Sequence, residues 1–365
     1  MEWNLISPRE KKSVIDQVLF NRGIDNAYRY LNITNEEVYN PLLLDNMREG
    51  AILLVKHINQ KSKVFVQIDE DCDGYTSAAV LINYLNLIAP NFVQNNLVYK
   101  THDRKEHGIV VQAVPPDTKL VIIPDAGSSQ LLEHSLLADA GMDVLILDHH
   151  NAHPYTPDAC LINNQTCDYP NKGLSGVGIV YKFCCYLDSL LGVQYAPQFL
   201  DLVAVGMIAD MMPLNNYETR YMVSEGLTHI NNAFLNGMIM KNEFYLKGKL
   251  TPHGVSFCIA PAVNAIARVG TKEERKLLFE SMLDFCAYDK IPSTKRGCSG
   301  QLETKVEQSC RNCTNIRNRQ NKDRDYSIET ADKQIDKLQL LSCPVLIIRF
   351  DEQPVNENLT GLIAN

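Results

Sequence analysis

The stretch VFVQIDEDCDG, residues 64–74, passes directly from a short apolar run into a cluster of carboxylates. Its first part, Val64–Ile68, has the length and β-branched content of a buried strand. The next segment, Thr76–Ile88, is nearly apolar throughout and long enough for a helix. The cluster Asp69-Glu70-Asp71-Cys72-Asp73-Gly74 is therefore predicted to form a strand-to-helix turn, and Gly74 permits a tight bend there.

The same pattern recurs further along the chain. Leu120–Ile123 predicts a strand that ends at Asp125, and Val144–Leu147 predicts another that ends at Asp148-His149-His150. Strands that alternate with helices form βαβ units, so we expect an α/β fold, a parallel sheet with helices on both faces. Because such sheets bind ligands at the carboxyl ends of their strands, the three acidic turns are expected along one edge.

The remaining pattern predicts the domain layout. Apolar residues at helical spacing predict helices at Asp16–Leu31, Leu42–Gln60, Ile179–Leu191 and Gln198–Ala209. We expect a catalytic α/β domain over residues 1–215 and a helical extension with a substrate-facing loop over residues 216–300. A long basic connecting helix is expected within residues 301–340, with Gln301–Arg324 as its core.

The end of the chain predicts the start of another domain. Cys343–Phe350 is apolar and has the length of a strand. One strand can neither bury its two faces nor satisfy its edges. We therefore expect residues 341–365 to open a second, substrate-binding domain of which this chain lacks most.

Composition narrows the class of protein. The chain has 365 residues, 45% hydrophobic and 21% charged, an ordinary globular balance. It contains no apolar run near the ~20 residues of a membrane span and no secretory signal, so we expect a soluble, cytoplasmic protein. Eleven cysteines, many in apolar segments, are expected to be reduced. A net charge of −8 argues against a globally basic nucleic-acid binder, although a local basic groove remains compatible with it.

The acidic turns predict a metal site. Carboxylates as close as Asp69, Asp71 and Asp73 repel one another unless a cation or proton intervenes. Asp125 and Asp148-His149-His150 add oxygen and imidazole ligands at neighbouring strand ends, a mixture that favours manganese over magnesium or calcium. There are enough ligands for two ions, the usual arrangement for phosphoester hydrolysis.

These motifs also have other interpretations. The three aspartates alone would fit a solvated turn or a helix cap, and an EF-hand is disfavoured because Val80 stands where its closing Glu belongs. Cys310-x-x-Cys313 is better explained by one helix face than by zinc. Arg311–Arg324 carries five basic residues against one Asp, which fits either phosphate binding or a solvated surface. Asn264 and Arg268, in an apolar segment, either pair structurally or face the active cleft.

Four ordered motifs carry a family resemblance. Residues 69–74, 124–129, 147–150 and 205–210 resemble the motifs of the DHH phosphoesterase superfamily. Within it, residues 174–178 and 260–268 look like the branch of RecJ-type single-strand DNA exonucleases. The similarity covers residues 64–268 and implies that the first domain is of the DHH type and that residues 341–365 begin a DHHA1-like domain.

The resemblance also implies roles for individual residues. Two manganese ions, with magnesium as a substitute, would be held by a set of five ligands in which Asp125 bridges: Asp69, Asp71, Asp125, His149 and Asp210. His150 would bind the scissile phosphate, and the expected substrate contacts are Asn264, Arg268, Arg317 and Arg324. Many relatives have a histidine where this chain has Gln67, which is a poorer ligand and is expected to weaken the first metal site. The residues left to orient the ligands are Asp73, Asp148 and His102 or His107.

The function that this resemblance implies is manganese-dependent hydrolysis of single-stranded DNA from the 5′ end to mononucleotides, in DNA repair and recombination. A single-strand-binding protein or another replication or repair protein is the expected partner. No interaction with a membrane is expected. Two alternatives remain open. One is a phosphodiesterase for oligonucleotides or cyclic dinucleotides, and the other is a non-catalytic nucleic-acid-binding accessory protein.

Overall fold

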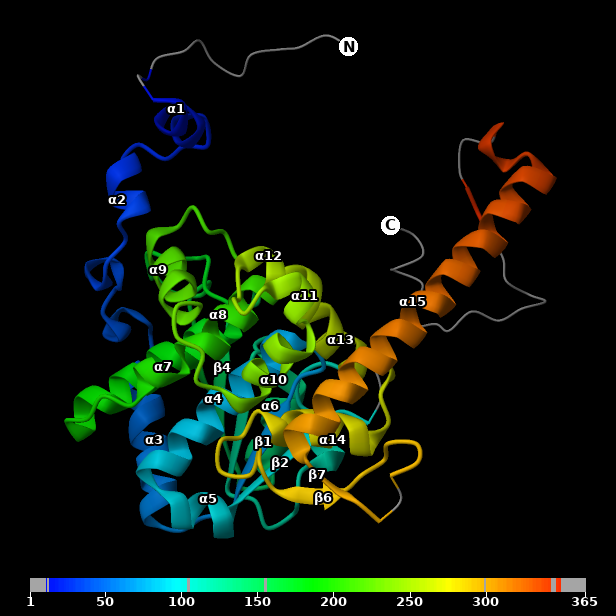
Figure 1. Cartoon of the computed structure of the whole chain (residues 1–365). Coiled ribbons are helices and arrows are strands. Elements are labelled where there is room, and N and C mark those ends of the chain that lie inside the picture. The colour runs from blue at the N-terminus through cyan, green and yellow to red at the C-terminus, as the bar shows by residue number, and fades with distance from the viewer. Residues whose placement is uncertain are drawn as a thin grey trace.

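The computed structural model describes residue 11 and residues 13–103, 106–153, 156–298, 300–342 and 346–348. Its centre is a five-stranded parallel sheet with the strand order β2-β1-β3-β4-β5 (Figure 1). The strands are β1 (Val64–Ile68), β2 (Leu97–Thr101), β3 (Leu120–Pro124), β4 (Asp143–Asp148) and β5 (Cys160–Asn163). The predicted α/β fold with a parallel sheet is confirmed.

The apolar pattern of the sequence predicts the three inner strands and misses the two at the edges. β1 and β3 are buried on both faces, which makes them continuous apolar runs. β2 is only partly buried and carries Lys100, and β5 has only four residues. An edge strand therefore lacks the apolar continuity that marks an inner one.

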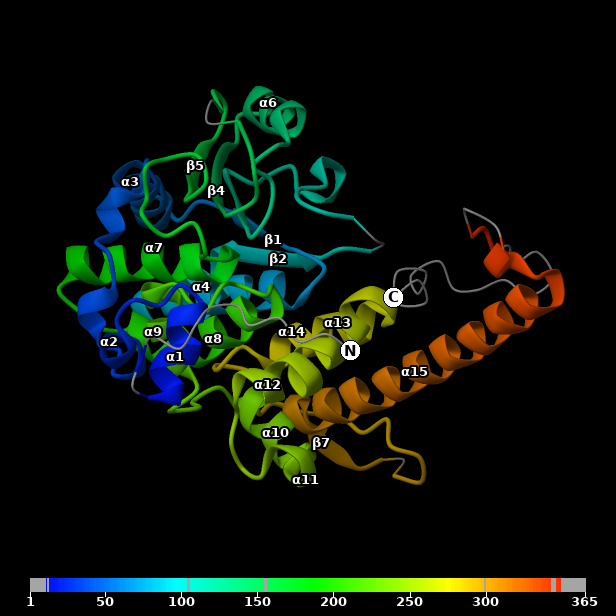
Figure 2. The same cartoon turned by 90° about the horizontal axis from the view of Figure 1, so that it is seen from above.

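The two faces of the sheet are covered by different helices. Phe65, Val121 and Ile146 contribute to a smaller core beneath α6 (Leu131–Asp139). Their alternate neighbours contribute to the larger core on the other face, beneath α3 (Met47–Asn59), α4 (Cys72–Ile88) and α7 (Gly176–Leu191). α8 (Leu200–Ala209) packs against α4 and α7 as a further layer (Figure 2).

Two predicted helices near the N-terminus have different limits. The segment 16–31 forms two helices, α1 (Val14–Asn21) and α2 (Ala27–Leu31), because Gly23 adopts a left-handed backbone with φ +77° between them. α3 begins at Met47, five residues later than predicted, after a 3₁₀ turn at Pro41–Leu43.

The remaining elements are mostly short. Among the residues described, the helices are α5 (Pro90–Asn96), α9 (Tyr217–Gly226), α10 (Ala233–Lys241), α11 (Glu243–Leu246), α12 (Pro252–Gly254), α13 (Ala260–Val269) and α14 (Lys272–Ser281). A π-helical segment, Val255–Ile259, joins α12 to α13. Further 3₁₀ turns lie at Asn35–Glu37, Val111–Ala113, Ala196–Phe199 and Leu340–Ser342, and a small hairpin pairs β6 (Lys290–Pro292) with β7 (Leu302–Thr304).

The long helix α15 spans Lys305–Leu338. It starts four residues later than predicted, because Thr304 and Glu307 form a capping box, and it continues past Arg324. Its first half packs on α10, α13 and α14, whereas its second half projects away from the rest of the molecule (Figure 2). The predicted strand Cys343–Phe350 and residues 351–365 lie outside the described residues, apart from 346–348, which have no regular structure.

Cys310 and Cys313 are buried on the face of α15 that packs against the domain. Neither belongs to a possible metal-binding group within the described ranges, and both thiols are free. None of the helices described has the length and apolar character needed to cross a bilayer.

Candidate metal centre

Three acidic or imidazole side chains meet where β3, β4 and α8 end. Asp125 directly follows β3, His149 directly follows β4, and Asp210 is the C-cap of α8. The Nε2 atom of His149 lies 3.4 Å from the Oδ1 of Asp125 and 3.4 Å from the Oδ2 of Asp210. The structure thus brings together three of the five predicted ligands, from segments 85 positions apart in sequence.

Asp73 completes one possible metal-binding group. One ligand atom from each of Asp73, His149 and Asp210 can be chosen so that all lie within 4.8 Å of one another. Asp73 sits in the first turn of α4, and its carboxylate accepts hydrogen bonds from the Gly176 amide at 2.8 Å and the Ser175 hydroxyl at 2.9 Å. The family resemblance implies only an orienting role for Asp73, and its place in the acidic triplet is the signal that it could do more.

A second group shares His149 with the first. It joins Asp125, Asp148, His149 and His150, again within 4.8 Å. The Oδ1 of Asp148 lies 2.7 Å from the Nδ1 of His150, and its Oδ2 accepts a bond from the Ser128 amide at 3.0 Å. This hydrogen bond to Asp148 raises the pKa of His150 to about 9.

The carboxylates of this centre lie close together for groups that carry negative charge. Burial and the charge of Asp73 raise the pKa of Asp71 to about 6 and that of Asp210 to about 7. The pKa of Asp125 is raised well above its ordinary value for the same two reasons, and its buried Oδ1 has no hydrogen-bond partner among the described residues. Buried carboxylates in this state need a proton or a cation, so the residues fit a divalent metal ion.

The backbone conformation allows these side chains to lie close together. Asp125 adopts a left-handed conformation with φ +65°, which is uncommon outside glycine and is tolerated best by Asp and Asn. Gly176, at the N-terminus of α7, lies so close that an added Cβ would stand 2.2 Å from the Oδ1 of Asp125. The glycine is therefore required by the close approach of α7 to the centre.

The first two residues of the acidic triplet have other neighbours. Asp69 contacts the Nε2 of His102 at 3.2 Å and the Nδ1 of His107 at 3.2 Å, and it accepts a bond from the Gly108 amide at 3.0 Å. Asp71 is the N-cap of α4 and accepts a bond from the Gly74 amide at 3.0 Å. Neither falls in the two groups, although the charge of Asp71 contributes to the raised pKa values of Asp125 and Asp210.

Gln67, the departure noted in the sequence, lies under the edge strand. Its side chain is buried, and its Nε2 donates to the Lys100 carbonyl at 3.0 Å. It therefore braces β1 against β2 and belongs to neither metal-binding group.

The four predicted substrate contacts divide into two pairs. Asn264 accepts a 2.8 Å bond from the Cys72 amide, which positions the start of α4 beside Asp71, and Arg268 is exposed one turn further along α13. Arg317 instead donates to the Phe257 carbonyl at 2.6 Å, and Arg324 pairs with Asp325 at 2.7 Å. Asn264 and Arg268 thus lie near the centre, whereas Arg317 and Arg324 on α15 contact Phe257 and Asp325 instead.

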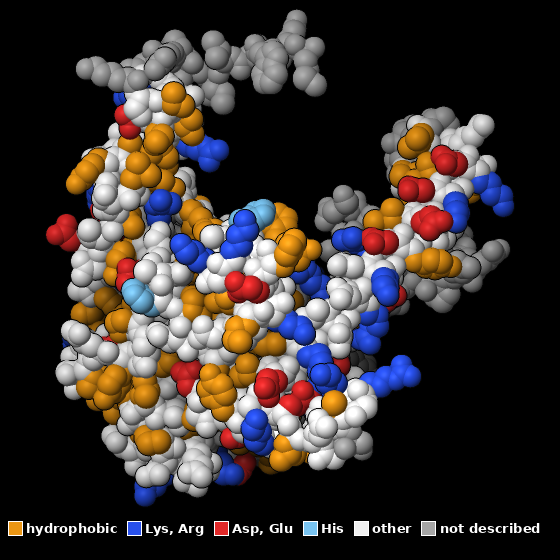
Figure 3. Space-filling view, in the orientation of Figure 1, with side chains coloured by type: hydrophobic (Ala, Val, Ile, Leu, Met, Phe, Trp, Pro, Cys, Tyr) orange, Lys and Arg blue, Asp and Glu red, His pale blue; other side chains and the backbone are white. Residues whose placement is uncertain are grey.

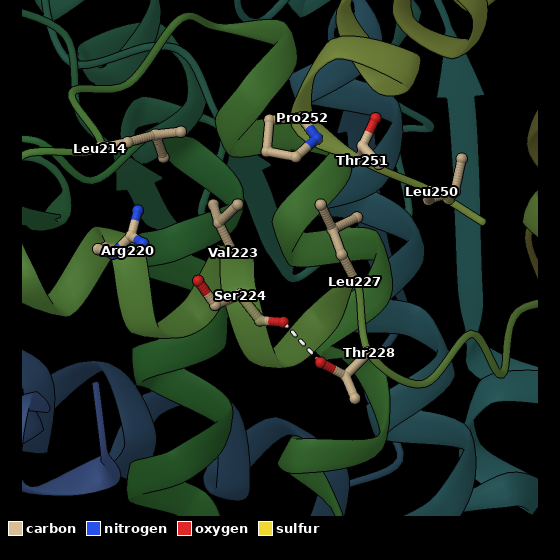
Figure 4. A pocket seen from close by; sticks show the side chains of 9 residues that line it. All are labelled: Leu214, Arg220, Val223, Ser224, Leu227, Thr228, Leu250, Thr251 and Pro252. Atoms are coloured by element: carbon tan, nitrogen blue, oxygen red, sulfur yellow. Dashed lines mark hydrogen bonds between the residues drawn. The ribbon is translucent and has the colours of Figure 1, made fainter. Parts of the chain in front are cut away.

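A separate cavity of about 310 Å³ lies between α9 and the segment that precedes α12 (Figure 4). Its lining contains no carboxylate or imidazole among the described residues, and Arg220 is its only charged side chain. The Thr228 hydroxyl donates to the Ser224 carbonyl at 2.8 Å along one wall. These lining residues offer no groups for hydrolysis.

Known proteins share this architecture. The model of the DHH family, N-terminal domain, matches residues 63–207. The chain is 38% identical over 371 residues to the SPbeta prophage-derived protein YorK of Bacillus subtilis, covering 100% of this chain and 63% of YorK. It is 28% identical over 294 residues to the single-stranded-DNA-specific exonuclease RecJ of the same bacterium, covering 74% of this chain and 36% of RecJ.

A crystal structure of the exonuclease RecJ bound to manganese superposes with a TM-score of 0.66 at 24% identity, covering 80% of this chain and 71% of that one. This likeness shows the fold. The chain spans less than two thirds of the length of YorK and of RecJ from Bacillus subtilis. The family model and these similarities together show a DHH domain over residues 63–207, in a chain that is similar to RecJ-type proteins.

Proposed function

We propose that this protein is a divalent-metal-dependent phosphodiesterase that hydrolyses single-stranded DNA from the 5′ end and releases mononucleotides. The observation that carries the proposal is the pair of metal-binding groups that share His149 at the carboxyl edge of the sheet. The relatives named as single-stranded-DNA-specific exonucleases support the substrate class.

The ligands that we propose differ in one position from those expected from the resemblance. Asp73, Asp125, His149 and Asp210, which belong to the two groups, would hold the ions together with Asp71, whose charge acts on Asp125 and Asp210. Asp73 takes the place of Asp69 because Asp73 lies in a group with His149 and Asp210, whereas Asp69 lies in neither group and contacts His102 and His107. Carboxylate oxygens together with imidazole nitrogen favour manganese, and magnesium would be the substitute.

Divalent ions bound there would polarise phosphate oxygens and lower the pKa of water. The chain contributes the rest of the chemistry. His150, held at Nδ1 by Asp148, presents its Nε2 from a side chain that is 59% exposed, which suits a hydrogen bond to a phosphate oxygen. Asn264 keeps the N-terminus of α4 in place beside these groups. A hydrogen bond from the fixed imidazole of His150 would stabilise charge that develops on the phosphoryl group.

The test measures nucleotide release with manganese, with magnesium and with a chelator. Single strands labelled at the 5′ or the 3′ end, matched duplexes and dinucleotides are the substrates. The proposal expects metal-dependent release of mononucleotides from the 5′ end of single strands and little from duplexes. Release from dinucleotides alone would favour the oligonucleotide alternative, and no hydrolysis with either metal would contradict the proposal.

A further inference from the structure

A cavity of about 1090 Å³ lies away from the metal centre, between α10 and α11 on one side and the π-helical segment and α15 on the other. It exceeds the ~300–1,000 Å³ of pockets that enclose a small ligand. Figure 3 shows Lys and Arg side chains gathered over α11 and the adjoining part of α15. We refer to it as the cationic cavity.

The charges of this cavity have one sign. Lys241, Lys247, Lys249 and Arg317 line it, and no Asp or Glu lies among its described lining residues. None of the three lysines forms a salt bridge within the part of the chain that the structure describes. In a protein with a net charge of −8, four cations without carboxylates form a local site for anions.

Exposed rings lie beside these cations. Phe257 is 60% exposed, and its ring centroid lies 4.4 Å from that of His253 at an interplanar angle of 37°. Phe244 and Tyr245, on α11, are also exposed and line the same cavity. Large rings in water are costly unless a ligand covers them, and every nucleic-acid base has a face that can stack on such a ring.

The ring of Phe257 is held on a rigid support. It belongs to the π-helical segment, and such segments occur frequently at functional sites. The Phe257 carbonyl accepts a 2.6 Å hydrogen bond from the Nη2 of Arg317. Arg317 therefore ties the segment to α15 and keeps its own positive charge at the wall of the cavity.

α13 links the cationic cavity to the metal centre. Ala262 lines the cavity, while Asn264, two residues on and thus on roughly the opposite side of the helix, bonds to the start of α4. Arg268 follows near Asp71. Six residues of helix separate Ala262 from Arg268, a rise of about 9 Å.

We propose that the cationic cavity binds single-stranded nucleic acid, with the lysines and Arg317 at the phosphates and Phe257 stacked on a base. This inference rests on the proposed function, since it names where the uncut part of the strand lies while its end is at the metals. Charge and stacking without base-specific contacts would give little sequence preference.

The test measures binding rather than hydrolysis. A labelled oligothymidylate of about 20 nucleotides, longer than the ~16 that one binding fold covers, is titrated with the full chain in the presence of a chelator, by fluorescence anisotropy at several salt concentrations. The variant Lys247→Ala/Lys249→Ala removes two cavity charges. Its matched control, Lys61→Ala/Lys119→Ala, removes two exposed charges at the amino edge of the sheet.

We expect the cavity variant to bind at least about fivefold more weakly. The slope of log affinity against log salt should fall by about 1.4, or about 0.7 for each lysine that no longer meets a phosphate. The control should match the parent. Phe257→Ala should also weaken binding about fivefold or more, whereas Phe257→Trp, which keeps a ring, should restore it. Thermal unfolding of each variant checks that it is folded.

Two results would overturn the inference. One is equal affinity and equal slope for the cavity variant and the parent, and the other is an equal loss in the control. Either can occur while the parent still hydrolyses single strands, so the proposed function would survive. A parent that binds through the cavity yet hydrolyses nothing would support the inference and contradict the proposed function.

Discussion

The metal centre and the cationic cavity use charge in opposite ways. The centre gathers buried carboxylates that raise one another's pKa, and the Oδ1 of Asp125 has no hydrogen-bond partner among the described residues. The cavity gathers cations that reach solvent, Lys241 on α10, Arg317 on α15, and Lys247 and Lys249 just after α11. A buried cluster of like charge depends strongly on its ion, whereas exposed charges act through solvent and are weakened by salt. Substitutions at the centre should therefore have large effects on metal binding and hydrolysis. Substitutions at the cavity should change the affinity for oligonucleotides in smaller steps.

The largest effect is expected for Asp125→Asn. Asparagine tolerates the left-handed backbone at this position better than alanine and removes the carboxylate that Asp125 contributes beside the shared His149. Hydrolysis should fall by at least about 10²–10³-fold, the scale of losing one preorganised electrostatic group. Manganese should no longer raise the thermal midpoint, while the metal-free protein stays folded. A variant that keeps both the metal-dependent stabilisation and the hydrolysis would contradict the metal assignment.

Asp73→Asn and Asp69→Asn separate the two ends of the acidic triplet. Asp73 lies in a group with His149 and Asp210, whereas Asp69 contacts His102 and His107. We expect calorimetric titration to show manganese affinity falling by about 100-fold or more for Asp73→Asn, and by about tenfold or less for Asp69→Asn, as for an orienting residue. The reverse order would return Asp69 to the ligand set.

The sequence predicts the metal centre better than the cavity for a physical reason. Inner strands such as β1 and β3 are apolar on both faces, so their ends, and the acids that follow them, can be located from the pattern. Which acid of the triplet points inward depends on how α4 meets α7, through contacts such as that of Asp73 with Gly176. These contacts leave no periodic pattern in the sequence.

The cavity is less accessible to prediction. Its walls come from residues 238–262 and 314–321, which meet only because α15 packs across α10 and α13. Charge alone singles out Arg317 in the sequence, but its hydrogen bond to the Phe257 carbonyl depends on a π-helical turn. Neither Lys247 nor Lys249 belongs to a charge run that would mark it.

A smaller effect is expected on α15, beyond the cavity. Arg324→Ala should change the salt slope of oligonucleotide binding by less than the ~0.7 that one phosphate contact contributes, because Arg324 pairs with Asp325 on an exposed surface. Arg317→Ala, from the cavity wall on the same helix, should lower the slope by about 0.7 and is its matched comparison. If the two variants give equal slopes, binding extends along the helix and is not confined to the cavity.

The smallest effect on metal binding is expected for Gln67→His. The family resemblance implies that a histidine here strengthens the first metal site, but the Gln67 side chain is buried and donates to the Lys100 carbonyl of β2. An imidazole placed there would point at the edge strand, so the manganese titrations of variant and parent should coincide within about twofold.

The variant should instead lose stability, by about 1 kcal/mol, since a buried hydrogen bond between β1 and β2 is replaced by one of poorer geometry. Chemical denaturation measures that loss, and Gln67→Met, of similar length but without the donor or a charge, provides the matched control. Tighter manganese binding by Gln67→His would mean that β1 can turn this side chain toward the carboxylates, and that the absence of a histidine does weaken the centre.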